Sequence, residues 1–366
     1  MEGEQPVNEN RLAITSWSAV SPFGIGRQSF VDGLRAGIGT VKTLEPGRWD
    51  GPDERACLVP GFDAREVLGS KGTRSMDRGT ALAVTAVGRL VDGDRDGIVG
   101  DGGDIAVVLG TTMGSAQSAV DFTRTSLTAE KPFYVDPSKM PNTVINCAAG
   151  QCAIWCGLKG PNTTLAGGRA AGLFGLTYAR RLLATGRAAR VLVGATEEYS
   201  TARAWLTARG RSGGPTDTVL GEGACVLLVE PASAVPPERS PLAEVLAVES
   251  RVHFRHNIAE VLTACVDAVL RSAAVTSDQV AAVVPSSVPG EGGEQEGAVL
   301  AGLFGEAALA EVPLVNLIGD AGAALGPLQI VMALETVRTP GSVVLVSTVD
   351  SAGSVSCALL RLAGER

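Results

Sequence analysis

Residues 162–194 read NTTLAGGRAAGLFGLTYARRLLATGRAARVLVG, and this stretch decides the fold. The run Thr163–Gly167 is short and apolar, as expected of a buried strand. The next segment, Ala170–Ala184, has small residues and an apolar rhythm of 3.6 residues, which predicts a helix. A short turn then leads into a second apolar run, Val191–Gly194. The stretch therefore predicts strand, helix and strand in sequence, the repeating unit of layered α/β structure.

The same order returns in the second half of the chain, which indicates an internal duplication. There the run Leu314–Ile318 is predicted as a strand, Ala321–Val337 as a helix and Val343–Val346 as the next strand. The other predicted strands are Leu12–Val20, Ile105–Gly110 and Cys225–Val229 in the first half, and Ala243–Val248, Val280–Val284 and Ser356–Leu360 in the second. We expect two halves, residues 11–238 and 241–366, joined by the proline-bearing segment Glu230–Ser240.

Composition excludes several classes of function. The 366 residues carry 31 basic and 39 acidic side chains, a net charge of −8, which argues against binding along a nucleic-acid backbone. No apolar run approaches the roughly 18 residues that would span a bilayer, so we expect no membrane contact and a cytoplasmic location. The seven cysteines are expected to be buried thiols rather than a disulfide framework.

Signals for cofactors and metals are weak, and we expect neither. The turn Gly24-Ile25-Gly26 resembles the opening of a dinucleotide fingerprint, but Ser29 stands at the third glycine position. Three cysteines at 147, 152 and 156 fall along one predicted helix, but their spacing fits no closed zinc pattern and no histidine is near. The only two histidines are His253 and His256.

Several motifs together resemble one enzyme family. The stretch Met140–Leu183, which includes INCAAGQCAIWCGLKGPNTTLAGGRAAGLFG, is similar to the centre of a β-ketoacyl synthase. Further similar motifs are ITSWSAVSPFGIG, FDAREVLGSKGTRSMDRGTALA, VLGEGACVLLVEP and IGDAGAALG. The resemblance covers essentially the whole chain. It implies the thiolase fold, an α/β architecture of two duplicated halves in a five-layer αβαβα stack with two mixed sheets, assembled as a dimer.

The chain departs from that family at every position that carries the condensation chemistry. The resemblance places a nucleophilic cysteine at the start of the buried helix, where this chain has Arg169, and a guanidinium cannot be acylated. The family's two histidines fall at Ser286 or Ser287 and at Asp320. A family lysine is replaced by Val315, and the gatekeeping GFGG turn reads VDSA at 349–352. We therefore expect no catalytic residue, only vestigial slots, and His253 and His256 lie too far along the chain to substitute.

This combination is similar to the chain length factor, or ketosynthase β subunit, of type II polyketide synthases. The resemblance implies an active ketosynthase α subunit as partner in a heterodimer, with a growing polyketide chain in a tunnel at their interface. An acyl carrier protein is expected to reach the complex mainly through the α subunit, because this chain is itself acidic. Glutamine usually replaces the cysteine in that subfamily, and because this chain has Arg169 instead, a role of this position in decarboxylation is not expected. The chain is also short for an aromatic system, which favours a linear, reduced or polyene product. The alternatives are a stand-alone acyltransferase or malonyl-carrier decarboxylase using Asp320, Ser287 or Cys147, and a homodimeric scaffold.

The resemblance also implies which residues line the tunnel. Val120, Thr123 and Leu127 match the capping positions on the helix that begins near Ser115, and Met113 lies in the turn before it. Their spacing of three and four residues puts Val120, Thr123 and Leu127 on one helical face. Aliphatic side chains there would leave more room than aromatic rings. The alternative is that this face is an ordinary core face of an amphipathic helix.

Two further expectations concern the side chain of Arg169 and the strand at the centre of the dimer. A buried guanidinium is costly unless it is paired, so we expect Arg169 to form a charge-assisted pair with Asp320. The alternative is that Arg169 faces solvent or a carboxylate of the partner. The strand that begins at Asn162 is expected to pair with the partner across the two-fold axis through Asn162, Thr163, Thr164 and Leu165.

Overall fold

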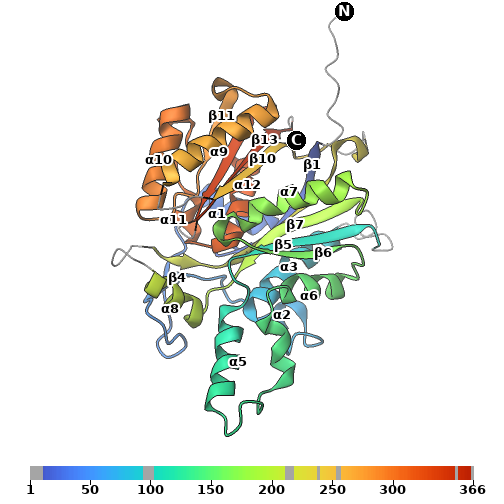
Figure 1. The fold of residues 1–366 in the computed structure, drawn as a ribbon, viewed down its shortest axis with the longest axis vertical. Coiled ribbons are helices and arrows are strands. Elements are labelled where there is room, and N and C mark those ends of the chain that lie inside the picture. The colour runs from blue at the N-terminus through green and yellow to red at the C-terminus, as the bar shows by residue number, and fades with distance from the viewer. Residues whose placement is uncertain are drawn as a thin grey trace, which may run out of the picture.

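The computed structural model describes residues 11–93, 103–210, 218–236, 240–252, 257–350 and 353–363. Its central feature is a mixed sheet whose main path runs β11-β12-β13-β10-β1-β9-β7-β5-β6 (Figure 1). The first half contributes β1 (Leu12–Ser21), β5 (Ile105–Thr111), β6 (Asn162–Ala166), β7 (Arg190–Glu197) and β9 (Gly223–Pro231). The second half contributes β10 (Ala243–Val252), β11 (Val280–Val284), β12 (Val343–Val349) and β13 (Ser354–Leu362).

The two halves repeat one pairing pattern. In the first half β5 pairs parallel with β6 and β7, and β9 pairs antiparallel with β7 and β1. In the second half β11 and β12 are parallel, whereas β13 is antiparallel to β12 and β10. This confirms the predicted α/β thiolase-type class with mixed sheets. The boundary between the halves stays a prediction, because residues 237–239 of the connecting segment lie outside the described residues.

The two expected sheets are joined edge to edge. β1 and β10 pair antiparallel over three residue pairs, from Leu12 opposite Val245 to Ile14 opposite Ala243. Just beyond this join, both strands shift register against their other neighbours, β1 between Ile14 and Ser16 and β10 between Val245 and Ala247. Such bulges bend strands and increase their twist, so the halves diverge after a short shared edge.

The prediction of a strand at Leu314–Ile318 is wrong. Leu314–Ile318 forms the short helix α11 instead, and the segment before it meets the edge of β11 at a parallel bridge between Leu309 and Val283. Pro313 precedes the helix with φ −58° and ψ 134°, which ends the extended segment before the apolar run begins. A buried apolar run of five residues does not by its periodicity distinguish a strand from a turn of buried helix.

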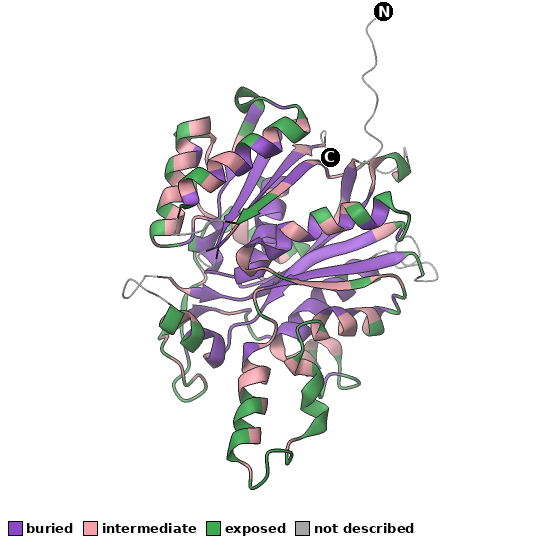
Figure 2. Cartoon of the chain, in the orientation of Figure 1, coloured by how far each residue is buried: buried purple, intermediate pink, exposed green. Residues whose placement is uncertain are grey.

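Helices form the remaining layers, and their packing explains the small-residue segments. α7 (Ala171–Ala184) and α12 (Leu325–Thr336) share one core with both sets of strands, and residues 325–334 of α12 are all buried. α3 (Arg78–Gly93) and α6 (Cys147–Cys156) cover the outer face of the first half. α9 (Ile258–Ala273) and α10 (Glu291–Phe304) cover that of the second. In Figure 2 the strands are mostly purple, whereas these covering helices show pink and green.

An arm leaves this layered body between β5 and α6. It consists of α5 (Ala116–Thr128) and a 3-10 helix, η1 (Pro137–Thr143), and it projects from the bottom of the view in Figures 1 and 2, where most of it is green. Smaller elements complete the chain: α1 (Arg27–Ala36), α2 (Ala64–Leu68), α8 (Thr201–Gly210), β2 (Gly24–Ile25), β3 (Lys42–Thr43), β4 (Arg55–Cys57) and β8 (Leu220–Gly221). Further single 3-10 turns are η2 (Gly168–Ala170), η3 (Ala232–Ala234), η4 (Ser277–Gln279), η5 (Glu306–Ala308) and η6 (Gly322–Ala324).

Two further findings concern the cysteines and the length of the helices. All seven cysteines lie in the described residues, and none of them forms a disulfide bond. Among the described helices, none combines the length and the apolar character that crossing a membrane requires.

Candidate functional site

Arg169 lies where β6 turns into the central helix α7. β6 ends at Ala166, and η2 leads directly into α7, so residue 169 stands at the amino end of a buried helix. Gly168 has φ +60°, and a Cβ atom there would lie 2.3 Å from a carboxylate oxygen of Asp350. Glycine is therefore required at this turn both for the backbone and for the close approach of Asp350.

Arg169 and Asp320 form the predicted pair. The guanidinium donates from Nε to Oδ1 at 3.1 Å and from Nη2 to Oδ2 at 2.5 Å, which is a bidentate geometry. Asp320 is 2% exposed and also accepts the Gly322 backbone N–H. Burial alone would raise the pKa of Asp320, but the adjacent Arg169 outweighs it and holds this pKa at about 2. Both groups are thus charged, and the alternative of a solvent-facing arginine is not what the structure has.

A second carboxylate completes the arrangement. The Asp350 Oδ2 atom accepts the backbone N–H of Arg169 at 2.8 Å and lies 3.7 Å from its Nη1 atom. Backbone N–H groups at such a helix terminus are the donors that stabilise an oxyanion in acyl transfer. Here the Asp350 carboxylate already accepts the hydrogen bond from the Arg169 backbone N–H. Asp350 belongs to the VDSA turn noted in the sequence, but its contact with Arg169 was not foreseen, and residues 351–352 of the turn lie outside the described residues.

The serines at the other vestigial slot are held by Glu296. The Ser286 hydroxyl donates to Glu296 Oε2 at 2.6 Å, and the backbone N–H groups of Ser286 and Ser287 donate to the same carboxylate. Ser347 donates a fourth hydrogen bond, at 2.6 Å. Burial raises the pKa of Glu296, whose side chain is completely enclosed. Ser286 therefore has a structural role in this network, and Ser287 sits beside it with φ +46°.

The surroundings of Cys147 do not favour an activated thiol, although it stands at the amino end of a helix. It is half-buried at the start of α6, and its Sγ atom donates to Asn142 Oδ1 at 3.3 Å. Burial, and secondarily the charge of Asp77, raise the pKa of this thiol. A thiolate is the reactive form, so this environment disfavours a nucleophile. His253 and His256 lie outside the described residues.

The predicted tunnel residues lie on the arm and not in the core. Val120, Thr123 and Leu127 line an open groove of about 440 Å³ along one face of α5. The side chain of Leu127 is 80% exposed, which rules out the alternative of an ordinary core face in this chain. Met113 is 43% exposed in the turn before α5 and does not line the groove. The groove also includes Ala119, Arg124 and Thr128.

The first half also has an open strand edge, and exposed apolar side chains lie on the arm and on α6. β6 is the last strand of the path and pairs with β5, so its other edge offers unpaired backbone groups. Residues 163–165 are half-buried, and the buried Thr164 Oγ1 atom has no hydrogen-bond partner among the described residues. Exposed large apolar residues gather in the neighbouring arm and α6, namely Met113, Leu127, Phe133, Tyr134, Met140, Val144, Ile145 and Ile154.

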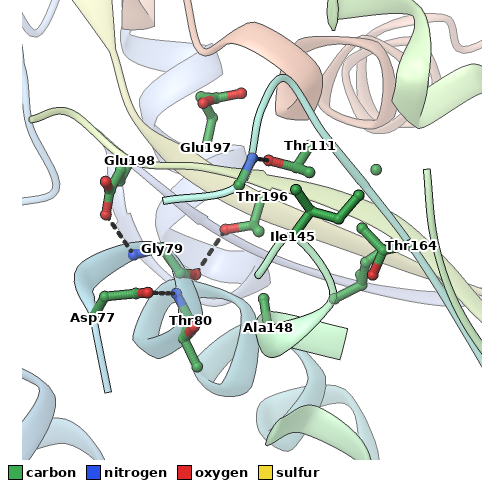
Figure 3. A pocket seen from close by; sticks show the side chains of 13 residues that line it. Asp77, Gly79, Thr80, Thr111, Ile145, Ala148, Thr164, Thr196, Glu197 and Glu198 are labelled. Carbon is green, nitrogen blue, oxygen red and sulfur yellow. Dashed lines mark hydrogen bonds between the residues drawn. The ribbon is translucent and has the colours of Figure 1, made fainter. Parts of the chain in front are cut away.

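A small pocket at the root of the arm holds carboxylates that the sequence analysis did not single out. Asp77, Glu197 and Glu198 face it together with Thr111, Ile145 and Thr164 (Figure 3). Glu197 and Glu198 are 2% and 4% exposed. Burial, and secondarily Asp77, raise the pKa of Glu198 to about 7. Their only sequence signal is a pair of acidic residues at the end of a buried strand.

Comparison with known proteins identifies the family. The family described as "Beta-ketoacyl synthase, N-terminal domain" matches residues 9–234. The chain belongs to the β-ketoacyl synthase family. Among curated proteins, it is 27% identical to the 3-oxoacyl-(acyl-carrier-protein) synthase 2 of Vibrio cholerae over 53% of this chain and 47% of that protein. The chain thus spans about half the length of that relative.

Two solved structures show which members of the family the chain is similar to in three dimensions. The chain is 45% identical to one described as the ishigamide ketosynthase/chain length factor, with a TM-score of 0.91 over 97% of this chain and 100% of that one. This match confirms the predicted resemblance and supports a ketosynthase-like chain length factor role. A second solved structure is described as a type II polyketide synthase acyl-carrier protein in complex with its ketosynthase. One chain of that complex has the same fold as this chain, with a TM-score of 0.79 and 18% identity over 96% of this chain and 99% of that one.

Proposed function

We propose that this β-ketoacyl synthase family member is a non-catalytic chain length factor, which pairs with an active ketosynthase and shapes the tunnel that limits polyketide length. The observation that carries the proposal is the state of Arg169. Its guanidinium stands where the family has its nucleophile, paired with Asp320, while Asp350 accepts its backbone N–H. A pocket filled by this chain's own charges has neither a nucleophile nor a free oxyanion donor to offer an acyl thioester.

The surface of the arm and β6 supports the partner. An open strand edge beside exposed apolar side chains is the composition of an interface that another chain covers. We infer that the active ketosynthase α subunit pairs there along Asn162–Leu165, as the name of the 45% identical structure also suggests. The acyl carrier protein would then act through the complex, docking mainly on the α subunit, because this chain carries a net charge of −8.

The groove on α5 supports the tunnel. Val120, Thr123 and Leu127 present aliphatic and small polar groups to a space that this chain alone leaves open. The partner would close the groove, and the polyketide chain would lie between the two subunits. Without aromatic rings at these positions, the tunnel accommodates long, unbranched chains, as a reduced or polyene product requires. We place the complex in the cytoplasm, because reducing compartments keep cysteines free and none of the seven cysteines forms a disulfide bond. We expect the complex to require no cofactor.

The test is co-expression with a candidate ketosynthase, followed by native mass spectrometry and carrier-dependent elongation assays of each subunit and of the pair. We expect a one-to-one complex, and elongation by the pair only. Acylation of this chain alone, or release of carbon dioxide from malonyl carrier by this chain alone, would overturn the proposal and favour the stand-alone enzyme. A stable homodimer that binds no ketosynthase would favour the scaffold.

A further inference from the structure

Glu198 connects the root of the arm to the body of the molecule. It follows β7 directly, and its two carboxylate oxygens have different partners. Oε2 accepts the backbone N–H of Gly79 at 3.1 Å, the contact drawn as a dashed line in Figure 3. Oε1 accepts the hydroxyl of Ser115 at 3.1 Å. Ser115 is the N-cap of α5, so one buried side chain joins the first residue of the arm helix to the start of α3.

The neighbouring Glu197 holds the preceding part of the same turn. It accepts both the backbone N–H of Thr112 at 3.1 Å and the Thr112 hydroxyl at 2.5 Å. Between these anchors, Gly114 has φ +73°, and a Cβ atom there would lie 3.1 Å from the Ile145 Cα atom. The segment that enters the arm and the segment that leaves it therefore meet at Gly114. The carboxylates of Glu197 and Glu198 hold the entering segment at Thr112 and Ser115.

Beyond this root, α5 packs against η1 and α8, and its residues after Ala116 are half-buried or exposed. Ala116 is its only buried residue, and one further tie is the backbone N–H of Ala202, which donates to Gln117 Oε1 at 3.0 Å. Leu127 lies eleven residues after Ala116, about 17 Å along a helix. A tilt of about 10° at the root would move Leu127 by about 3 Å, roughly the length of one two-carbon unit. The angle at Ser115 thus sets where the groove ends.

We propose that Glu198 is a positioning residue for product length, because its hydrogen bond to Ser115 fixes the angle at which α5 presents Val120, Thr123 and Leu127 to the tunnel. This inference rests on the proposed chain length factor function. Asp77 is a second carboxylate beside Ser115: it interacts with the Ser115 and Ser118 hydroxyls and accepts the backbone N–H of Thr80 at 2.7 Å. Glu198 differs from it in joining Ser115 to the backbone of Gly79.

The test compares product lengths made by the reconstituted pair with wild-type chain, Glu198→Ala and Glu198→Gln. Glutamine can accept from Gly79 and donate to the Ser115 hydroxyl, so it keeps both contacts, whereas alanine loses both. We expect the share of the main product to fall about twofold or more in Glu198→Ala, with neighbouring lengths rising, and to stay near wild type in Glu198→Gln. A role in stability alone would lower total turnover without changing this distribution.

A second variant keeps the test decisive if Glu198→Ala does not assemble. Ser115→Gly removes the hydroxyl that donates to Glu198, while glycine remains an acceptable N-cap residue for α5. It should broaden the product distribution as Glu198→Ala does. If neither variant changes the distribution while Val120→Phe does, the role of Glu198 is refuted and the tunnel stands. If Val120→Phe and Leu127→Phe also leave the products unchanged, the proposed function itself fails, and this inference fails with it.

Discussion

Arg169 donates two hydrogen bonds to Asp320, one to each carboxylate oxygen, across a separation of 151 residues in the chain. The pair joins the strand-to-helix turn of the first half to the turn after α11 in the second. Because the side chains are 17% and 3% exposed, solvent does little to screen the interaction. Arg169, which the resemblance places at the nucleophile position of the family, here forms part of a structural junction between the halves.

Removing the arginine should therefore cost stability. Arg169→Ala leaves Asp320 and Asp350 buried near each other without their shared cation, so we expect the free energy of unfolding to fall by about 3–5 kcal/mol. Urea titration of the purified protein or complex measures this. The matched control is Arg35→Ala, because Arg35 and Asp32 form an exposed pair, with side chains 62% and 60% exposed. There we expect a loss of about 0.5 kcal/mol or less. Equal effects of both changes would contradict the junction.

Restoring a cysteine should not restore acylation. In Arg169→Cys the new thiol lies beside the carboxylates of Asp320 and Asp350, which raise the pKa of a thiol and so disfavour the thiolate. Asp350 also keeps the backbone N–H that an oxyanion would need. Intact mass spectrometry after incubation with acyl carrier should show acylation of the partner ketosynthase and none of the variant. Stoichiometric acylation of Arg169→Cys would mean that Asp350 leaves the amide readily.

Much of the fold could be predicted because its signals are local. The run Thr163–Gly167 and the small-residue helix after it have periods that physical packing requires, and both are present. Leu314–Ile318 was predicted wrongly because five consecutive apolar residues fit a buried strand and a buried helical turn equally well. Which one forms depends on Pro313 and on tertiary packing.

The candidate site divides in the same way. Arg169 and Asp320 could be paired from the sequence, because the resemblance placed opposite charges in one pocket. The contact with Asp350 depends on how closely the turn at Gly168 approaches it, which no pattern of residue types records. Glu197 and Glu198 were missed because adjacent acidic residues are usually solvated, and only the packing of α3 and the arm root buries them.

The buried Glu198 should make stability depend on pH. Its pKa is raised from 4.5 to about 7 in the folded protein, so the neutral form is favoured by folding. Its contribution is fully present below pH 4.5 and is lost as pH rises through 7. This difference corresponds to about 3 kcal/mol. Urea titrations from pH 5 to 8 should show the wild type losing stability relative to Glu198→Gln, which cannot ionise. Glu45→Gln, at a side chain 73% exposed, should follow the wild type throughout. Parallel curves for wild type and Glu198→Gln would show that Glu198 is not the titrating group.

Filling the groove on α5 should shorten the product. Val120 and Leu127 face the groove seven residues apart, so a phenylalanine at either position adds ring volume to the space assigned to the growing chain. We expect the pair containing Val120→Phe or Leu127→Phe to release products shorter by at least one two-carbon unit, measured by mass spectrometry of the carrier-bound chains. Thr125→Phe is the matched control, because Thr125 lies on α5, is exposed and does not line the groove. An identical shift in Thr125→Phe would indicate that any bulky change disturbs the arm, and unchanged products in both groove variants would contradict the proposed function.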